Sequence, residues 1–339
     1  VNGQSTINVT LVEDANKLDE IVVTGYGTQA KKDLTGAVTV VDTDELKSVP
    51  ATTFSQQLQG RAAGVTIIND ARPGGEATVR IRGFGTLGNN DPLYIIDGVP
   101  SQRQSNLNPN DIESLQVLKD ASSASIYGSR AANGVIIITT KKGKMGKPTI
   151  SYNTYYGIQS PANDVEALNA EELGEYLYLA DLYAGKTPSH GQYTFGANGA
   201  VTIPDYVFPS GAMEGDPGTD PSLYALGPGN IYAITRSADT DWWQEVSQSA
   251  PIQSHNISAS GATEMARYAF SLGYFSQESI VKFFSYDRVS LRANTEFRAL
   301  NKKLTIGENF TASFDNLKGF VSNDDEQSPV SGSYKHHPL

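Results

Sequence analysis

Cysteine is missing altogether from this sequence of 339 residues. The chain therefore cannot contain a disulfide framework, a zinc site built on thiolates or a cysteine nucleophile. Basic residues are also scarce relative to acidic ones, with 26 Lys and Arg against 37 Asp and Glu and a formal net charge of -11 at pH 7. Nucleic-acid binding requires clustered cations that neutralise phosphates, so this charge balance argues against that function.

Long hydrophobic runs are absent as well. No stretch approaches the roughly 18 consecutive apolar residues that a transmembrane helix requires. This absence excludes helical insertion only, because the strands of a transmembrane β-barrel alternate lipid-facing and lumen-facing residues and keep the average hydropathy of a soluble protein. The length of the chain suggests two or three domains.

Patterns of catalytic or metal-binding residues are not recognisable either. The four histidines are scattered or terminal, and the acidic run at 324–326 lacks the spacing of a calcium loop. No Ser/His/Asp order and no pair of carboxylates has a supporting motif. We therefore expect no enzymatic activity, no metal site and no cofactor.

Short strands and helical segments alternate in the part of the chain before Thr149. Strands are predicted at Leu34 to Val41, Val65 to Ile68, Thr78 to Arg82, Leu93 to Ile96 and, as a central strand, Val135 to Thr140. Helices are predicted after Thr43 or Asp44, over Phe54, Leu58 and Ala62, after Asn108-Pro109 with Ile112, Leu115 and Leu118 on one face, and from Asp120 to near Gly128. The dipeptide Asp97-Gly98 favours a type I′ hairpin turn. This part predicts a compact α+β domain.

From Thr149 onward the pattern changes to long segments with alternating faces. In the segment from Arg267 to Phe275, Phe270 and Leu272 share one face while Arg267 and Ser271 share the other. The segments Arg288 to Arg298 and Leu304 to Asp315 alternate in the same way. Strands of roughly 9 to 12 residues with one apolar and one polar face suit a water-filled barrel in lipid. A soluble β-sandwich has the same period, so the alternation alone leaves both architectures open.

The lengths of the connections help to decide between these architectures. Gly261 to Met265 and Leu300 to Lys303 are short, whereas Gln277 to Tyr286 and Pro161 to Pro251 are longer. Alternation of short and long connections is typical of an outer-membrane barrel, which has short periplasmic turns and long external loops. The longest connection contains a predicted helix at Ala170 to Tyr183, and it would be the first external loop.

Several stretches between Asp19 and about Lys147 carry a resemblance to a known family. They are DEIVVTGYGTQAKKDLTGAV at Asp19 to Val38, LQGRAAGV at Leu58 to Val65, IRGFGTLGNNDPLYIIDGVP at Ile81 to Pro100, NPNDIESLQVLKDASSASIYGSRAANG at Asn108 to Gly134 and GSRAANGVIIITTKKGK at Gly128 to Lys144. With their spacing, they resemble the SusC/RagA family of TonB-dependent outer-membrane transporters. The resemblance implies an α+β plug domain followed by antiparallel transmembrane β-barrel strands, an incomplete portion of a barrel of about 22 strands.

The resemblance also implies a division of the chain into four parts. Residues 1–16 would be the last strand of an N-terminal β-sandwich like the carboxypeptidase regulatory domain, and residues 17–30 a linker with a TonB box. Residues 31–148 would be the plug domain. Residues 149–339 would be the first strands and loops of the outer-membrane β-barrel, which is truncated here.

The β-prone island in the linker resembles a TonB box, an extended segment that pairs with a strand of the periplasmic protein TonB. Its residues are Glu20, Ile21, Val22, Val23, Thr24, Gly25 and Tyr26. An ordinary edge strand would have the same composition. The position of the island after one domain and before the plug favours the TonB box.

The function implied by the resemblance is TonB-dependent active import of an oligosaccharide or peptide in the outer membrane of a Gram-negative, Bacteroidota-type bacterium. The implied partners are TonB with ExbB and ExbD, a SusD-like surface lipoprotein, the ligand and outer-membrane lipid. Polar plug loops facing the outside would contact the substrate. Candidate contacts are Arg72, Asn89, Asn90, Asp91, Gln102 and Arg103. The alternative is a soluble or surface protein for binding or signalling that reuses a plug-like domain.

Overall fold

The computed structural model describes residues 21–24, 27–30, 38–41, 51–70, 72–101, 107–120, 124–162, 167–190, 193–203, 206–207, 235–236, 239–319, 329–335 and 338. The chain forms two compact units. The first contains residues up to 157 with 252–277 and 285–317, and the second contains 158–251, 278–284 and 318–339. Within the described ranges, no helix is both long and apolar enough to span a membrane.

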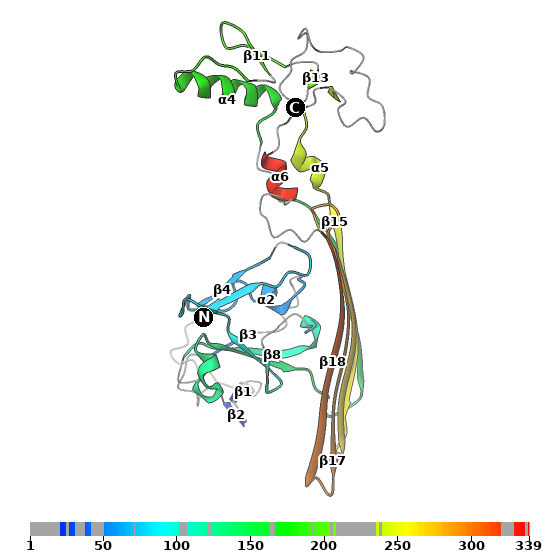
Figure 1. Cartoon of the computed structure of the whole chain (residues 1–339). Helices are drawn as coiled ribbons and strands as arrows, with labels where there is room; N and C mark the ends of the chain where they lie inside the picture. The colour runs from blue at the N-terminus through cyan, green and yellow to red at the C-terminus, as the bar shows by residue number, and fades with distance from the viewer. Residues whose placement is uncertain are drawn as a thin grey trace, which may run out of the picture. The chain divides into compact units, whose positions relative to one another are not determined.

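A five-stranded mixed sheet forms the core of the α+β domain in the first unit (Figure 1). Its strands, in spatial order, are β3 (Val38–Val41), β8 (Ile112–Leu118), β9 (Val135–Thr140), β6 (Leu93–Ile96) and β7 (Val99–Ser101). Strand β9 is central, antiparallel to β8 and parallel to β6, and its residues 135–138 are all buried. The sequence prediction of a central strand over Val135 to Thr140 is confirmed.

A second layer covers this sheet. It consists of the antiparallel pair β4 (Val65–Ile68) and β5 (Thr78–Ile81) and of the short helix α2 (Phe54–Gln57). Thr53 begins α2 with a capping box that involves Gln56, which satisfies backbone groups at the helix start. Phe54, Leu58 and Ala62 are buried in one cluster, as their spacing predicts.

The segment that follows Asn108 differs from its prediction. Pro109–Asp111 form a single 3₁₀ turn, η2, and the chain then runs straight into strand β8. The helix predicted over Ile112 to Leu118 is therefore wrong. Most of this strand is buried, so its apolar residues do not alternate and also fit a helical spacing. Further along, the chain forms the 3₁₀ turns η3 (Ser125–Tyr127) and η4 (Ser129–Ala131), with a left-handed Gly128 between them.

The first unit also contains a long five-stranded sheet (Figure 1). Its strands, in order, are β10 (Thr149–Gln159), β15 (Ala250–Ala262), β16 (Ala266–Glu278), β17 (Ser285–Ala299) and β18 (Leu304–Lys318). The turns at 263–265 and 300–303 lie together, because the backbone N–H of Arg298 donates to the carbonyl of Met265 at 2.8 Å. We call these strands the long sheet.

The second unit is built from the long connections. Helix α4 (Ala170–Tyr183) begins at Asn169 with a capping box to Glu172, and the predicted helix is confirmed. Gly174 of α4 packs closely against Tyr193 and Val201. The other elements of this unit are β11 (Thr194–Phe195) paired with β12 (Val201–Thr202), β13 (Tyr206–Val207) paired with β14 (Thr235–Arg236), α5 (Trp242–Val246) and α6 (Pro329–Lys335).

Candidate functional site

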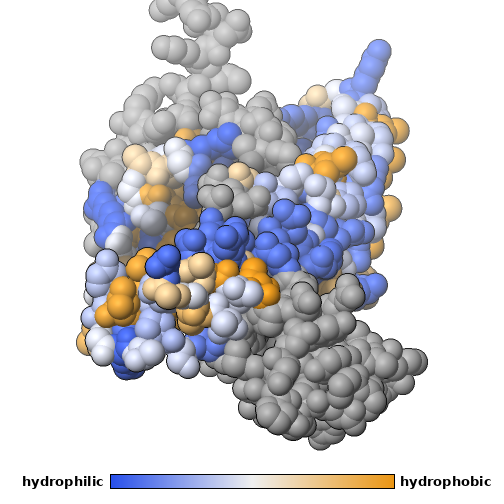
Figure 2. Space-filling view, turned by 90° about the horizontal axis from the view of Figure 1, so that it is seen from above, coloured by the Kyte–Doolittle hydropathy of each residue, from blue (hydrophilic) through white to orange (hydrophobic). Residues whose placement is uncertain are grey.

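The two faces of the long sheet differ in chemistry and in burial. On β15 and β16, the buried residues Ser254, Asn256 and Ser271 lie on the face toward the α+β domain, which we call the inner face. The exposed residues Phe270 and Leu272 lie on the opposite, outer face. Figure 2 shows hydrophobic side chains along one outer edge of the molecule and hydrophilic ones gathered inside that edge. The predicted alternation of the two faces is confirmed.

The central contact between the α+β domain and the inner face is a buried ion pair. Arg292 of β17 lies 2.5 Å from Asp97, and their side chains are 7% and 4% exposed. The guanidinium also donates to Thr140 Oγ1 at 2.7 Å and to Thr311 Oγ1 at 2.6 Å. Breaking such a pair leaves an uncompensated buried charge, so this contact holds the two parts in one arrangement.

Local structure places Asp97 for this contact. Asp97 and Gly98 have φ values of 49° and 87°, the left-handed pair required by a type I′ turn between β6 and β7. The predicted turn is confirmed. The Asp97 carboxylate accepts the backbone N–H of Thr140 at 2.9 Å and its hydroxyl at 2.6 Å, so the end of β9 fixes the carboxylate toward Arg292.

A second group of contacts lies next to this pair. Asn108 Nδ2 donates to Ser290 Oγ at 3.3 Å. Gly273 lets the domain approach closely, because a Cβ there would lie 2.3 Å from Asn108 Nδ2. Burial raises the pKa of the Asp111 carboxyl, although a hydrogen bond from Ser271 and the charge of Arg292 act in the opposite direction.

A third group of contacts lies near the connection between β16 and β17. The Thr52 hydroxyl donates to Gln277 Oε1 at 2.9 Å. Gly74 packs against the ring of Tyr286, with no room for a Cβ. The turn at Pro73 to Gly75 therefore lies toward the end of the long sheet that carries this longer connection.

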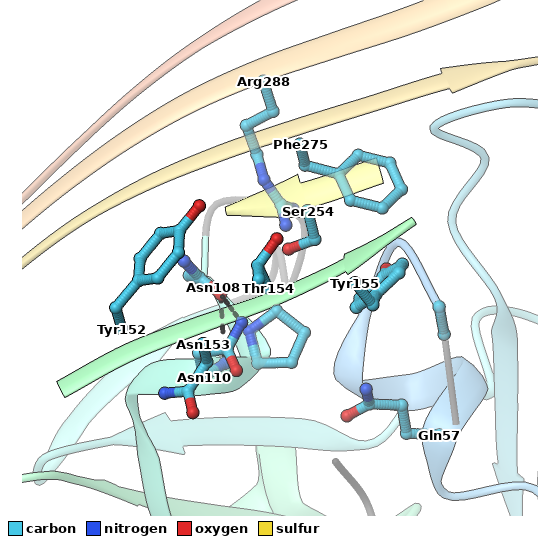
Figure 3. Close-up of a pocket in the computed structure, with 12 residues that line it drawn as sticks. Gln57, Asn108, Asn110, Tyr152, Asn153, Thr154, Tyr155, Ser254, Phe275 and Arg288 are labelled. Atoms are coloured by element: carbon cyan, nitrogen blue, oxygen red, sulfur yellow. Dashed lines mark hydrogen bonds between the residues drawn. The ribbon is translucent and has the colours of Figure 1, made fainter. Parts of the chain in front are cut away.

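Between the second and third groups, the domain and the inner face enclose a cleft of about 390 Å³ (Figure 3). The residues that line it are Ala51, Gln57, Asn108, Pro109, Asn110, Tyr152, Asn153, Thr154, Tyr155, Ser254, Phe275 and Arg288. Figure 3 shows Arg288 and Phe275 reaching into it from the sheet, opposite Gln57 of α2 and the Asn108–Asn110 turn. The Arg288 guanidinium lies over the Phe275 ring at 5.6 Å from its centroid.

The predicted substrate contacts are spread over several loops. Arg72 is exposed in the loop between β4 and β5 and pairs with Asp70 at 2.7 Å. Its hydrogen bond lowers the pKa of the Asp70 carboxyl. Gln102 and Arg103 lie outside the described residues. The structure thus places Arg72 near Gly74 and the third group of contacts, while Gln102 and Arg103 stay a prediction.

Residues 89–91 form part of a tightly bonded loop. The Asn90 side chain is 5% exposed; its oxygen accepts the N–H groups of Gly85 and Thr86, and its nitrogen donates to the carbonyls of Thr86 and Gly88. Its amide is therefore used in shaping the loop. Asp91 forms an ion pair with Arg80, and the side chain of Asn89 accepts the N–H of Asp91. The exposed parts of this loop, including Phe84 and Leu87, remain open for contacts.

The predicted TonB box lies partly within the described residues. Strand β1 (Ile21–Thr24) pairs antiparallel with β2 (Gly27–Ala30), from Ile21 opposite Ala30 to Thr24 opposite Gly27. Glu20, Gly25 and Tyr26 lie outside the described residues, as do residues 1–16. The β-prone island is therefore a strand, and its role in partner binding stays a prediction.

Sequence reasoning missed the residues that join the domain to the sheet. The alternation of the segment Arg288 to Arg298 predicts Arg288 and Arg292 on its polar face, but it indicates no partner for either side chain. The one available signal was the carboxylate of the Asp97 turn, which falls directly after a buried strand. In the part of the chain that the structure describes, no group of three His, Asp or Glu side chains is arranged to hold a metal ion.

Comparisons with known proteins consistently find TonB-dependent receptors. Residues 30–135 match the family model of the TonB-dependent receptor plug domain. The chain is 37% identical over 330 residues to TonB-dependent receptor P26 of Formosa agariphila, covering 95% of this chain and 29% of that protein. It is 36% identical over 300 residues to TonB-dependent receptor SusC of Bacteroides thetaiotaomicron, covering 85% and 25%.

Solved structures give the same result. The RagAB peptide importer in its open-open state matches with a TM-score of 0.70 and 30% identity, over 88% of this chain and 33% of that one. The closed-closed state matches with a TM-score of 0.67 and 33% identity, over 85% and 32%. The chain thus spans 25% to 33% of the length of these relatives.

Proposed function

Because this chain belongs to the SusC/RagA family of TonB-dependent outer-membrane transporters, we propose that it works in the TonB-dependent import of a nutrient across the outer membrane. The α+β domain is the plug, and the long sheet is the first part of the β-barrel. We assign residues 31–148 to the plug, 149–339 to barrel strands and loops, 17–30 to the linker and 1–16 to the end of a preceding β-sandwich. The protein acts as a transporter and not as an enzyme.

The observation that carries this proposal is that the plug covers the polar inner face of the long sheet. The inner face presents Ser271, Arg288 and Arg292, all buried by the α+β domain, while apolar side chains are exposed on the outer face. A soluble binding or signalling protein has no reason to keep this arrangement, because its exposed face would be largely polar. In a barrel, the same arrangement separates lipid from a plugged aqueous lumen.

Our proposals for the ligand class and the partners are based on the family. The relatives include SusC and the RagAB peptide importer, and we propose an oligosaccharide or a peptide as ligand. We propose TonB with ExbB and ExbD as the energy source, a SusD-like lipoprotein as surface partner and outer-membrane lipid around the barrel. Arg72, Asn89, Asp91, Gln102 and Arg103 are proposed plug contacts to the ligand, with Asn90 shaping the loop. The relatives from Formosa and Bacteroides support a Gram-negative, Bacteroidota-type host.

Deletion of Ile21 to Tyr26 in the full-length protein tests this proposal. The deletion should abolish energised uptake and leave ligand binding at the cell surface nearly unchanged, because the segment supplies main-chain bonds to TonB and not to the ligand. Val22→Pro, which removes one main-chain donor, should weaken uptake, whereas Val22→Thr keeps the donor and serves as the matched control. Growth of the deletion strain on the imported nutrient at the wild-type rate would contradict the proposal.

A further inference from the structure

The cleft between the plug and the barrel wall lies between two closed contacts. Along β17, four successive inner-face residues are Tyr286, Arg288, Ser290 and Arg292. Tyr286 packs against Gly74, Ser290 accepts from Asn108, and Arg292 pairs with Asp97. Arg288 alone among these four lines the cleft.

Along strand β16, the cleft residue likewise lies between two residues that contact the plug. Gln277 accepts from Thr52, Phe275 lines the cleft, and Gly273 lies against Asn108. The plug therefore contacts the wall toward the connection between β16 and β17, leaves a space at Phe275 and Arg288, and contacts the wall again further along both strands. A ligand that passes along this wall would meet the cleft after the first contact opens and before the second one does.

We propose that this cleft is an intermediate binding subsite for one sugar unit of an imported oligosaccharide, which rests on the proposed import function. Its volume of about 390 Å³ falls in the range of about 300–1,000 Å³ found for small-molecule sites. The subsite is distinct from any contact on the plug loops that carry Arg72 or Asn89.

The lining has the chemistry that a sugar ring requires. A pyranose has apolar C–H faces and a rim of hydroxyl groups that both donate and accept hydrogen bonds. The ring of Tyr155 offers a flat apolar surface with a negative face to such C–H groups, and Phe275, whose ring lies under the Arg288 guanidinium, adds apolar surface to the lining. Gln57, Asn110 and Asn153 bring side-chain amides, which both donate and accept, to the lining for the hydroxyl rim, and one donor of Asn110 is shared with Asn108 Oδ1 at 3.3 Å.

The same lining disfavours other ligands. It contains no carboxylate, so it offers a cationic peptide side chain no direct ion-pair partner within the lining. Its aliphatic surface is limited to Ala51 and Pro109, which leaves little to bind an aliphatic side chain. Arg288 is compatible with neutral sugars and with acidic ones, since it donates to hydroxyl and carboxylate oxygens alike.

A buried amide donor lies at the contact that bounds the cleft. Asn256 lies on β15 two residues from the cleft residue Ser254 and is 1% exposed. Its Nδ2 has no hydrogen-bond partner within the described part of the chain. A buried donor without a partner is costly, and Asn256 faces Gly273 at the contact that bounds the cleft, outside the lining itself.

The decisive experiment fills the cleft with a larger side chain on strand β15 of the long sheet. In the full-length protein, Ser254→Trp places an indole in the cleft, and the adjacent outer-face substitution Gln253→Trp is the matched control. The probes are radiolabelled maltohexaose, laminarihexaose, xylohexaose and mannohexaose, together with a tryptic peptide mixture. Initial uptake is measured in cells with equal outer-membrane amounts of each variant, and surface binding is measured after the proton gradient has been collapsed.

The proposal predicts gene-dependent uptake of at least one of these hexasaccharides. Ser254→Trp should lower that uptake at least about tenfold, because an overfilled site cannot admit the ring, with surface binding retained and Gln253→Trp unaffected. Should Ser254→Trp assemble poorly, the plug-side pair Gln57→Ala and Asn110→Ala, which empties the site without filling it, must reduce uptake instead.

Two results would overturn the subsite. One is uptake by assembled Ser254→Trp at the rate of Gln253→Trp, and the other is gene-dependent uptake of peptides with none of the four hexasaccharides. The deletion of Ile21 to Tyr26, assayed in parallel, separates the two proposals. If the deletion stops uptake and Ser254→Trp does not, only the subsite fails, and if the deletion has no effect, the import function itself fails.

Discussion

On β16, the inner-face residues Ser271 and Phe275 are 8% and 4% exposed, whereas the outer-face residues Phe270 and Leu272 are 46% and 50% exposed. The plug strand β9 behaves differently, because its apolar residues are buried on both faces. A strand of an ordinary core buries its apolar side chains, while β16 buries the polar Ser271 together with Phe275 on one face and exposes apolar side chains on the other. The long sheet is therefore built for a polar plug on one side and a hydrocarbon environment on the other.

Successive pairs between β15 and β16 show where the outer apolar band stops. On the outer face, Ala259 pairs with Phe270, Ile257 with Leu272 and His255 with Tyr274. The next cross-strand pair on this face is polar and consists of Gln253 and Ser276. The His255 ring stacks between the rings of Tyr152 and Tyr274, with centroids 6.2 Å and 6.3 Å away. Aromatic residues collect at the edges of the apolar band of a barrel, so we expect the membrane boundary at this row.

Arg292→Met is expected to have the largest effect on the inner face. The substitution leaves the Asp97 carboxylate buried without its counter-charge, which costs about 3–5 kcal/mol. We expect the plug of the full-length protein to be digested faster by protease in isolated outer membranes. The cells should also become sensitive to vancomycin, which is too large for an intact, plugged barrel.

Two further variants calibrate this effect. Arg298→Met breaks a partly exposed pair with Glu296 and should cost about 0–1 kcal/mol. In Arg292→Met with Asp97→Asn, the charge is removed from both sides and asparagine tolerates the left-handed turn position, so much of the protection should return. A double variant as leaky as Arg292→Met alone would contradict the role of the charge.

Phe310→Arg and Asn309→Arg compare the two faces directly, because they are neighbours on β18. Thr311 contacts Arg292, so odd-numbered residues of this part of β18 lie on the inner face and Phe310 lies on the outer face. An arginine on the lipid face near the midplane costs about 2–4 kcal/mol. We expect Phe310→Arg to reduce the heat-modifiable, assembled fraction in the outer membrane, with Asn309→Arg close to the wild type. The reverse order would mean that the faces are wrongly assigned.

Gly273→Ala tests the close approach of the plug to the wall. The added Cβ would lie 2.3 Å from Asn108 Nδ2 and 2.7 Å from Ser290 Oγ, and overpacking of this kind costs about 1–3 kcal/mol. We expect faster proteolysis at the turn of 108–111. Gly157→Ala is the control, since its nearest side-chain neighbour would be an ordinary contact at 3.4 Å. Equal digestion of the two variants would show that the turn does not depend on this contact.

Asp111→Asn should have the smallest effect on the protease resistance of the plug, and it should increase this resistance where the other substitutions decrease it. Burial raises the pKa of Asp111 in the docked plug, so protonation favours docking, and this contribution is lost as the pH rises through the raised pKa. At neutral pH, asparagine removes the cost of the buried charge, a gain on the order of 1 kcal/mol. Protease resistance should increase at neutral pH and match the wild type in acid. Lower resistance at neutral pH would mean that the bonds of the ionised form dominate.

Local sequence patterns were sufficient for the faces of the long strands, the Asp97-Gly98 turn and helix α4. They failed for Ile112 to Leu118, where a strand buried along most of its length lost the alternation that separates strands from helices. The candidate site was beyond their reach for another reason. Asp97 and Arg292 are 195 residues apart, and nothing in a single sequence indicates which buried charge faces which.

Electron paramagnetic resonance of spin labels on the outer face tests the central claim most directly, and none of these 339 residues is a cysteine that would compete for the label. Single cysteines replace Phe270, Leu272 and Ser276 in the full-length protein, which is reconstituted in lipid bilayers. Labels at Phe270 and Leu272 should collide with molecular oxygen far more than with a water-soluble nickel chelate, and the label at Ser276 should show the reverse preference. Equal nickel accessibility at Leu272 and Ser276 would contradict a lipid-facing wall behind a polar, plugged lumen.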